Sequence, residues 1–345
     1  MRYKRVVITR HGPAEVLQVI EEDVPQPGMG EVRLNVLAAG VAFTDVLVRE
    51  GLYPGIPKVP FSPGYTVVGR VDAVGTAVTS LRSGQRVAAL TIVGGYSEFI
   101  CLPASDCVVI PEEVDAAEAV CLVLQYVTAE QLLHRVAQVK SGNRILIHGA
   151  AGGVGTALLQ LGKLAGLEMY GTASASKHEL VRRLGGIPID YQHHDFVEQI
   201  RTLTGEGVDV VLDAIGGWHL LQSYRSLRKH GQLVCYGFSS ALANSPYRIV
   251  KLGFTFALLA WLKLLPTGRQ VHFYSIADLK AKHPDWFRAD LTRLLQLLAE
   301  GKLYPILSDR LPLTEAARAH EQLEHSRVSG QLVLQSCDRD RESEA

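Results

Sequence analysis

The sequence has few cysteines, no net charge and no signal for secretion. Only five of its 345 residues are Cys, without a Cys-x-x-Cys pair, which fits a reducing compartment better than a disulfide framework. The 35 basic residues balance the 35 acidic ones, so charge does not favour nucleic acid or an anionic membrane as the main partner. The segment Met1–Ile8 lacks the apolar core of a secretory signal. We therefore expect a soluble, cytoplasmic protein.

The longest apolar run is too short to cross a bilayer. Leu252–Leu265 has 14 residues and is broken only by Gly253, Thr255 and Lys263, whereas a spanning helix needs roughly 18. We expect a buried helix or the wall of a pocket here. Contact with a membrane surface or with another subunit is the alternative. Over the whole chain 47% of residues are apolar, enough for the cores of two domains.

The pattern of apolar segments changes near residue 122. Before it, Pro-Gly and Gly turns separate short strand-like runs, which is typical of a barrel-like β domain. These predicted strands are Tyr3–Thr9, Val32–Ala39, Val67–Val74, Arg86–Thr91 and Tyr96–Leu102.

After a predicted helix at Ala116–Arg135, strands and helices alternate, which predicts a parallel, doubly wound sheet. The strands are Ile145–His148, Glu168–Thr172, Val208–Leu212 and Gln232–Tyr236. The helices are Val154–Ala165, Ser176–Leu184, His194–Leu203 and Trp218–Leu227. Towards the end of the chain we expect helices at Asp290–Glu300 and Glu315–Leu323, a short run at Leu311–Leu313 and a last strand at Gln331–Gln335.

A glycine turn between the first of these strands and its helix is the strongest single motif. Ala150–Gly155 reads Ala-Ala-Gly-Gly-Val-Gly and fits G-x-G-x-x-G with alanine in the first place. A helix that begins at about Gly153 presents free backbone N–H groups and a partial positive charge, which suit a diphosphate. Gly152 would let the backbone approach the pyrophosphate, and Gly155 would let helix and strand pack closely. We expect a dinucleotide to bind at Ala151, Gly152, Gly153 and Val154.

Motifs along nearly the whole chain resemble the medium-chain dehydrogenase/reductase superfamily, and in particular its zinc-independent, quinone-oxidoreductase-like branch. They are His11–Leu17, Asp45 with Gly51–Pro54, Pro63-Gly64 with Gly69, Gly84–Val87, Gly95–Glu98, Thr128, Ala150–Gly155, Lys177, Tyr191 and Gly330–Leu334. The resemblance implies a GroES-like catalytic domain at 1–123 and 279–337, interrupted by a Rossmann domain at 124–278. We expect residues 338–345 to form a frayed, charged tail.

The same comparison of motifs argues against a metal. Zinc relatives bind a catalytic ion through Cys and His side chains, and zinc wants three protein ligands and one open position. Here Phe43 stands at the first ligand's position, and the Gly-His-Glu motif reads Gly64-Tyr-Thr66. A four-cysteine lobe for structural zinc is missing, and the adjacent His193 and His194 suit a solvated loop. We expect no metal.

The resemblance implies NADPH as the cofactor. An NAD site wants an acid about 20 residues after the glycine turn, but the sequence has none between Glu168 and Glu179. Ser174 and Lys177 suit a 2′-phosphate, and the resemblance places Lys177 and Tyr191 at positions that contact it. It also places Thr128 at the nicotinamide carboxamide and Phe238 at the nicotinamide ribose.

For the chemistry, Tyr53 resembles the tyrosine that protonates or stabilises the developing oxyanion in related reductases, a role that general acid catalysis requires. Asp45 is a candidate for orienting groups at the site. Three departures from the family pattern, Ala42, Thr66 and Gln125, remove polar groups and favour a hydrophobic substrate.

We therefore expect a metal-free oxidoreductase that passes hydride from NADPH to a quinone or an α,β-unsaturated carbonyl. The alternative is a non-enzymatic NADPH-binding protein of the same fold that associates with a membrane or a partner. Oxidation of a saturated alcohol is a third reading, against which the missing zinc ligands weigh. The run Gln270–Ile276 is the candidate edge strand of a homodimer, since an unpaired β edge is a docking surface.

Overall fold

The computed structural model describes residues 1–242, 248–325 and 328–336. The chain forms two compact units, of which unit 1 comprises Met1–Val127 and Asp285–Ala345 and unit 2 comprises Thr128–Pro284. The expected domain boundaries at 123/124 and 278/279 lie within six residues of these divisions. The expected tail at 338–345 lies outside the described residues.

Unit 1 is built on a sheet whose neighbouring strands are antiparallel, except for one parallel pair at its edge. The sheet has the order β14-β15-β3-β4-β5-β7, with β6 paired to β3, and a separate hairpin joins β1 and β2. The strands are β1 (Arg2–Ile8), β2 (Leu17–Asp23), β3 (Glu31–Val41), β4 (Thr66–Val74), β5 (Arg86–Leu90), β6 (Phe99–Pro103), β7 (Val108–Val109), β14 (Leu307–Pro312) and β15 (Gln331–Gln335). Short strands separated by glycine turns were expected here, and the GroES-like β-rich part of the fold class is confirmed.

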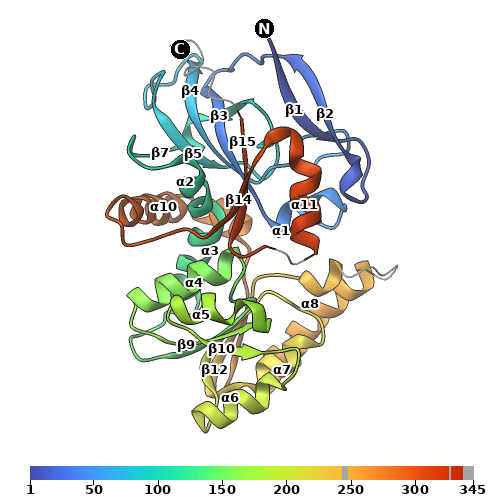
Figure 1. Cartoon of the computed structure of the whole chain (residues 1–345), viewed down its shortest axis with the longest axis vertical. Helices are drawn as coiled ribbons and strands as arrows, with labels where there is room; N and C mark the ends of the chain where they lie inside the picture. Colours follow the sequence, from blue (N-terminus) through green and yellow to red (C-terminus); the bar gives the residue numbers. More distant parts are fainter. Residues whose placement is uncertain (243–247, 326–327, 337–345) are drawn as a thin grey trace. The chain divides into compact units, whose positions relative to one another are not determined.

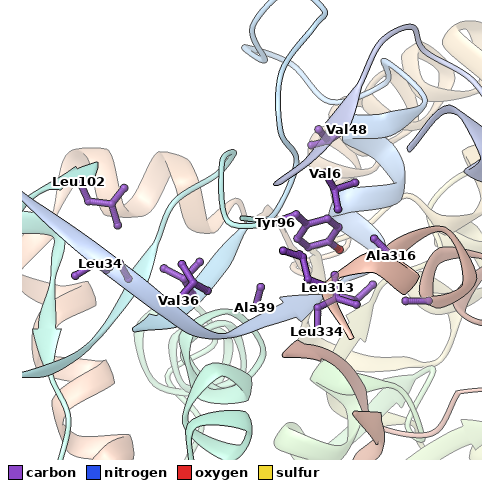
Figure 2. Packing of buried hydrophobic residues seen from close by; sticks show 14 of the residues in the cluster. Val6, Leu34, Val36, Ala39, Val48, Tyr96, Leu102, Leu313, Ala316 and Leu334 are labelled. Carbon is purple, nitrogen blue, oxygen red and sulfur yellow. The ribbon is translucent and has the colours of Figure 1, made fainter. Parts of the chain in front are cut away.

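The helices of unit 1 are α1 (Phe43–Arg49), α2 (Ala116–Cys121), α10 (Pro284–Ala299) and α11 (Ala316–Glu324), with single 3₁₀ turns at Ala14–Val16, Ala104–Asp106 and Leu313–Glu315. Inward-facing residues of the sheet form one apolar core with residues of α1 and α11. Figure 2 shows Tyr96 among aliphatic side chains of this core, including Val6 and Leu313. Tyr96 is completely buried, so its hydroxyl needs a partner inside the protein.

Unit 2 is a doubly wound parallel sheet, as expected. Its strands are β8 (Arg144–His148), β9 (Glu168–Ala173), β10 (Ile187–Asp190), β11 (Val208–Asp213), β12 (Leu227–Cys235) and β13 (Gln270–Phe273). Their order β10-β9-β8-β11-β12-β13 is that of a Rossmann fold, in which ligands bind at the carboxyl ends of the strands where the order reverses. That point lies between β8 and β11.

Helices connect the successive strands of this sheet (Figure 1). They are α4 (Gly153–Leu164), α5 (His178–Arg183) after a 3₁₀ turn at Ala175–Lys177, α6 (Phe196–Thr204), α7 (His219–Arg225) and α8 (Arg248–Leu264), with a 3₁₀ turn at Ser239–Leu242 before α8 and α9 (Ile276–Lys282) after β13. The candidate edge strand at Gln270–Ile276 contains β13, which forms one edge of the sheet and pairs with β12. The strand is shorter than expected, because it ends at Phe273 and Ser275 caps α9.

The segment expected as one helix at Ala116–Arg135 is helical but not uniformly α-helical. After α2 it widens into π-helical turns at Leu122–Tyr126, returns to α-helix as α3 (Val127–Glu130) and widens again at Gln131–Val136. Hydrophobic periodicity alone does not distinguish these windings, and π turns are often found near functional sites.

The apolar run Leu252–Leu265 lies in α8, but the expectation of a buried helix holds for only one of its sides. Leu258, Leu259 and Leu262 are buried in the core of unit 2. Trp261 and Leu264 instead expose 51% and 82% of their surface. Within the described part of the chain, the structure contains no helix that is both long and apolar enough to cross a membrane.

Candidate functional site

The glycine turn lies at the carboxyl end of β8, and α4 begins at Gly153 as expected. The first turn of α4 contains Gly153, Val154 and Gly155, all uncharged, so its free N–H groups face no competing carboxylate of that turn. A Cβ on Gly155 would lie 2.3 Å from the carbonyl oxygen of Gly149, which is shorter than any tolerable contact. Only glycine at 155 lets the helix start this close to the strand, so the local geometry fits a diphosphate.

The residues expected at the adenosine 2′-phosphate end follow two neighbouring strands. Ala173 of β9 pairs with Asp190 of β10, so the next residues, Ser174 and Tyr191, leave the sheet at the same edge. Tyr191 exposes 53% of its surface. Lys177 ends the 3₁₀ turn that Ser174 precedes, and partial burial lowers the pKa of its ammonium group. This edge therefore offers hydroxyl and ammonium donors to an anion.

Asp190, the last residue of β10, places an acid at this edge. The segment that follows β9 in sequence contains no acid before Glu179, so the sequence pattern did not predict Asp190 at this edge. Its carboxylate accepts from the backbone N–H of Gln192 at 3.0 Å and lies 2.8 Å from Nδ1 of His193. These hydrogen bonds, the one from His193 first, lower the pKa of Asp190. His193 is thus a hydrogen-bond partner of this carboxylate.

In unit 1, Tyr53 forms a close pair with Tyr65. The two hydroxyl oxygens lie 2.6 Å apart, and the rings meet edge to face with centroids 5.8 Å apart. Tyr65 is completely buried, whereas Tyr53 is partly exposed and packs against the core of unit 1. One hydroxyl must donate to the other, so the pair can pass a proton or stabilise a phenolate on the exposed member.

Asp45 holds the backbone around this pair. It is fully buried on α1 and accepts from the N–H of Ala42 at 2.9 Å and from the N–H of Gly64 at 3.2 Å. Burial raises the pKa of Asp45 to about 7, against the lowering effect of these backbone donors. Because Gly64 directly precedes Tyr65, the carboxyl group of Asp45 fixes the loop that carries Tyr65. These backbone contacts are those of a positioning residue, and the orienting role of Asp45 at the site stays a prediction.

A buried polar chain connects the same region to α11. The Tyr96 hydroxyl lies 3.1 Å from Nε2 of His320, and Nδ1 of His320 lies 3.3 Å from the guanidinium of Arg49. Arg49 in turn donates to Glu324 at 2.8 Å. Burial, and then the charge of Arg49, lower the pKa of His320 to about 3, so this histidine is neutral at physiological pH. The chain satisfies the Tyr96 hydroxyl and stiffens α1, which carries Asp45.

The remaining cofactor candidates lie in unit 2. Thr128 is buried in α3, the first residue of that unit. Phe238 follows β12 and stacks on Phe273 of β13 with ring centroids 5.5 Å apart, and it also contacts Phe256 of α8 at 5.3 Å. The ring of Phe238 is thus held in an aromatic cluster after the strand end expected to face the nicotinamide ribose.

A second buried network lies at the point where the strand order reverses, and the sequence did not predict it. Asp213, the last residue of β11, accepts from Ser223 at 2.6 Å and lies 3.0 Å from Nδ1 of His219. The Ser223 hydroxyl also lies 3.1 Å from Nε2 of His148, the last residue of β8. The other Asp213 oxygen accepts from the N–H groups of Ile215 and Gly216.

These contacts set the charges of the network. Burial raises the pKa of Asp213, but hydrogen bonds from His219 and Ser223 and the neighbouring imidazoles outweigh it and hold the pKa below the usual range. Burial, and then His219, lower the pKa of His148 to about 3. The network therefore holds a carboxylate beside a neutral imidazole and joins the ends of β8 and β11.

Among the residues that the structure describes, His148, Asp213 and His219 are the one group whose ligand atoms lie close enough to hold a metal, all within 4.8 Å of one another. The Ser223 hydroxyl lies within 3.4 Å of an atom of each of the three residues. Its hydrogen bonds, with those from Ile215 and Gly216, provide partners for both oxygens of the Asp213 carboxylate. At the positions where zinc relatives carry ligands, Phe43 opens α1 and Tyr65 bonds Tyr53.

The three departures from the family pattern are all buried in unit 1. Ala42 is 8% exposed, Gln125 4% and Thr66 1%. The signal for Tyr65 was present in the Gly64-Tyr-Thr66 motif, but it was interpreted only as the loss of a zinc ligand. The spacing of 12 residues from Tyr53 does not by itself reveal that the two hydroxyls meet.

Two protein-family models match the chain. A model described as the alcohol dehydrogenase GroES-like domain matches residues 28–112, and one described as zinc-binding dehydrogenase matches residues 186–334. A quinone oxidoreductase from Pseudomonas aeruginosa is 33% identical over 335 residues, which cover 96% of this chain and 99% of that protein. The chain belongs to the quinone-oxidoreductase-like branch of the medium-chain dehydrogenase/reductase superfamily. This confirms the family that the sequence motifs resembled.

Two further relatives represent the range of this family. The synaptic vesicle membrane protein VAT-1 homolog of Rattus norvegicus is 34% identical over 316 residues, covering 90% of this chain and 78% of that protein. The structure of Escherichia coli quinone oxidoreductase complexed with NADPH superposes with a TM-score of 0.86 at 28% identity, covering 96% of this chain and all of that one. The family therefore includes proteins named for redox chemistry and proteins named for a membrane.

Proposed function

We propose that this protein is an NADPH-dependent oxidoreductase that transfers hydride, without a metal, to a quinone or to an α,β-unsaturated carbonyl compound. The observation that carries the proposal is the Tyr53–Tyr65 hydroxyl pair. It stands where a zinc relative would bind a Lewis acid, and it offers a protein hydroxyl to the oxygen on which charge develops. Family membership and the likeness to an NADPH-bound quinone oxidoreductase support the same activity.

The cofactor is assigned to unit 2. The N–H groups of Ala151, Gly152, Gly153 and Val154 lie at the turn that opens α4, where a diphosphate is stabilised by the helix N-terminus. Ser174, Lys177 and Tyr191 supply donors to the 2′-phosphate that distinguishes NADPH from NADH. Thr128 is assigned to the nicotinamide carboxamide and Phe238 to its ribose. When bound there, NADPH would supply the hydride.

The protein supplies the proton. As the acceptor carbon gains hydride, negative charge moves onto the conjugated oxygen, and Tyr53 donates a hydrogen bond or its proton to that enolate. Tyr65 then donates to the phenolate oxygen of Tyr53 and limits the cost of its charge. Asp45 is assigned to hold Tyr65 in place through Gly64. Hydride plus proton completes a two-electron reduction of the acceptor.

We assign a hydrophobic substrate to this site. Ala42, Thr66 and Gln125 stand where relatives carry Asn, Glu and Lys, and all three are buried. Ala42 in place of Asn removes a polar group, and Thr66 and Gln125 replace charged side chains with neutral ones. Both kinds of change favour hydrophobic quinones and lipid-like enals or enones, because burying a charge is costly.

A substrate panel tests this proposal. NADPH consumption is followed at a fixed enzyme concentration with quinones, enones, enals and a saturated alcohol–NADP⁺ pair. We expect turnover with members of the first three classes and a clear preference for NADPH over NADH. Equal affinity for the two cofactors would contradict the cofactor assignment.

A non-enzymatic NADPH-binding protein is the second candidate, favoured by the resemblance to a vesicle membrane protein. Tight NADPH binding with no turnover of any acceptor would establish it in place of the reductase.

We also propose a homodimer that forms through β13, since this strand lies at an edge of the sheet. Native mass measured by light scattering tests that proposal.

A further inference from the structure

Helix α8 has an apolar face on each side. The side that faces the sheet buries Leu258, Leu259 and Leu262. On the opposite side, residues spaced three or four apart point to solvent, and all of them are apolar. They are Val250, Gly253, Ala257, Ala260, Trp261 and Leu264. Val250 exposes 66% of its surface, Trp261 51% and Leu264 82%.

Exposed aromatic groups widen this outer face. Trp218, at the start of α7, is 70% exposed and lies against Phe254 of α8 with ring centroids 4.6 Å apart. Phe256 is 43% exposed and contacts Phe238 and Phe273. We call the exposed side of α8 together with Trp218 the α8 face. Contiguous apolar surface of this kind, as distinct from single exposed apolar residues, marks an interaction site.

The α8 face differs from an ordinary surface helix of the same chain. Helix α10 has nearly the same length and also buries leucines, among them Leu291 and Leu294. Its exposed positions, however, include Arg288, Thr292 and Gln296. The apolar outer side of α8 is therefore not a general property of helices in this protein.

The charged residues of α8 itself have one sign, since its sequence contains Arg248, Lys251 and Lys263 and no Asp or Glu. Between Asp213 and Asp278 the sequence contains no Asp or Glu, although the whole chain has equal numbers of acidic and basic residues. Lys or Arg occupies positions 225, 228, 229, 248, 251, 263 and 269. Arg228 pairs with Glu206 and Asp209, so the positive charge of the α8 face is assigned to the residues of α8. Lys251 and Lys263 lie near the two ends of α8, on either side of the apolar stripe. The overall neutrality that argued against an anionic membrane conceals this acid-free segment.

We propose that the α8 face docks peripherally on an anionic lipid membrane. A helix about 25 Å long with Trp, Phe and Leu side chains suits insertion to the depth of the lipid headgroups, and flanking lysines suit anionic lipids. A second copy of the chain is a poorer occupant, because two surfaces of the same positive charge repel each other. Docking through the α8 face does not require catalysis.

The test uses the whole chain and vesicles of phosphatidylcholine with or without phosphatidylserine, separated by flotation. We expect binding to the vesicles that contain phosphatidylserine, weakening as salt is added. Leu264→Glu should lower the partition coefficient at least about tenfold, and Lys263→Glu about fivefold.

Helix α4 provides matched controls, since it also ends in an exposed Lys-Leu pair, Lys163 and Leu164. Leu164→Glu and Lys163→Glu make the same chemical changes in the same unit, away from the α8 face, and should leave partitioning close to that of the wild type. NADPH binding by every variant verifies folding. If Leu264→Glu does not fold, Trp218→Gln tests the same face from another element and should weaken binding.

Three results would overturn the proposal. The first is absence of binding to anionic vesicles, and the second is an equal loss of binding in the α4 and α8 variants. The third is a fall in native mass for Leu264→Glu without a change in vesicle binding, which would assign the face to a second copy. None of these results bears on NADPH turnover, so the proposed reductase activity stands or falls separately.

Discussion

The two units each contain a fully buried aspartate, and the pKa values of the two carboxyl groups move in opposite directions. Asp45 of unit 1 is held by backbone N–H groups of Ala42 and Gly64, and burial raises its pKa to about 7. Asp213 of unit 2 has the partners Ser223 and His219, whose hydrogen bonds hold its pKa below the usual range despite burial. Equal burial therefore gives opposite charge behaviour, because the donors differ.

This contrast follows the division of work that we propose. In unit 1, Asp45 fixes the loop that carries Tyr65, whose hydroxyl pairs with that of Tyr53. We assign proton donation to this pair. In unit 2 the aspartate joins the ends of β8 and β11, and the surrounding edge is equipped for anions. Changes in unit 1 should therefore affect turnover before cofactor affinity, and changes in unit 2 should affect cofactor affinity or stability first.

The largest effect is expected for Asp213→Ala. It leaves the buried Ser223 hydroxyl, the His219 ring and the N–H groups of Ile215 and Gly216 without their acceptor, and each buried donor left unsatisfied costs about 1–3 kcal/mol of stability. Chemical denaturation followed by circular dichroism measures this loss. Glu179→Ala, at an exposed position on α5, is the control and should change stability by less than about 0.5 kcal/mol. If Asp213→Ala and Glu179→Ala lowered the free energy of unfolding by the same amount, the network would have no structural role.

The second effect is a dependence of the free energy of unfolding on pH, to which Asp45 should contribute. Its folded pKa of about 7 exceeds the value near 3.9 of an unfolded aspartate, so folding takes up a proton in this range. The stability due to Asp45 is fully present below about pH 4 and is lost as pH rises to 7, by about 1.4 kcal/mol per pH unit.

Denaturation midpoints of wild type and Asp45→Asn across this range isolate the contribution of Asp45. The difference between the two proteins should change steeply from pH 4 to 7 and level off above it. Asp213 should behave in the opposite sense, with its stability lost as pH falls through the acidic range. A constant difference between wild type and Asp45→Asn would show that Asp45 keeps its charge throughout.

The third effect concerns turnover. Tyr53→Phe removes the proposed proton donor and should lower kcat at least about tenfold, since a positioned general acid is worth this much or more. The dissociation constant for NADPH should not change, because Tyr53 belongs to unit 1. Tyr65→Phe should give a smaller loss, and Tyr304→Phe, at an exposed position of unit 1, none. Unchanged kcat in Tyr53→Phe would transfer the role to water.

The smallest effect is expected at the cofactor edge. Lys177→Ala should raise the NADPH dissociation constant about tenfold, the scale of one charge-assisted hydrogen bond, and leave NADH binding unchanged. Lys163→Ala is the control on a neighbouring helix of unit 2. A parallel loss of affinity for both cofactors would place Lys177 away from the 2′-phosphate.

The sequence predicted those features that local physics determines. The glycine at 155 is required because a Cβ there would overlap the carbonyl of Gly149, and that requirement is visible as a motif. Four strands of the parallel sheet, β8, β9, β11 and β12, were predicted because each is a short apolar run between helical stretches, and the segment of β13 was predicted as an edge strand. The short strand β10 was not predicted. Both the fold class and the family were therefore available before the structure.

Features that depend on residues far apart in the chain were not predictable in the same way. The Tyr53–Tyr65 pair requires the geometry of two loops, and the Asp213 network joins the ends of two strands to residues of α7. Helix α8 shows a third limit. Because both of its sides are apolar, periodicity does not indicate which side is buried, and only the packed sheet reveals an exposed Trp261 and Leu264.

The central claim is direct, metal-free hydride transfer from NADPH, and isotope transfer tests it most directly. The enzyme is incubated, in the presence of a chelator, with a hydrophobic enone and NADPH deuterated at the transferring position of C4, and the product is analysed by NMR. We predict that NADPH is oxidised and that one deuterium appears on the β-carbon of the saturated ketone, with the second hydrogen coming from solvent. A product without deuterium, or activity abolished by the chelator, would contradict this account.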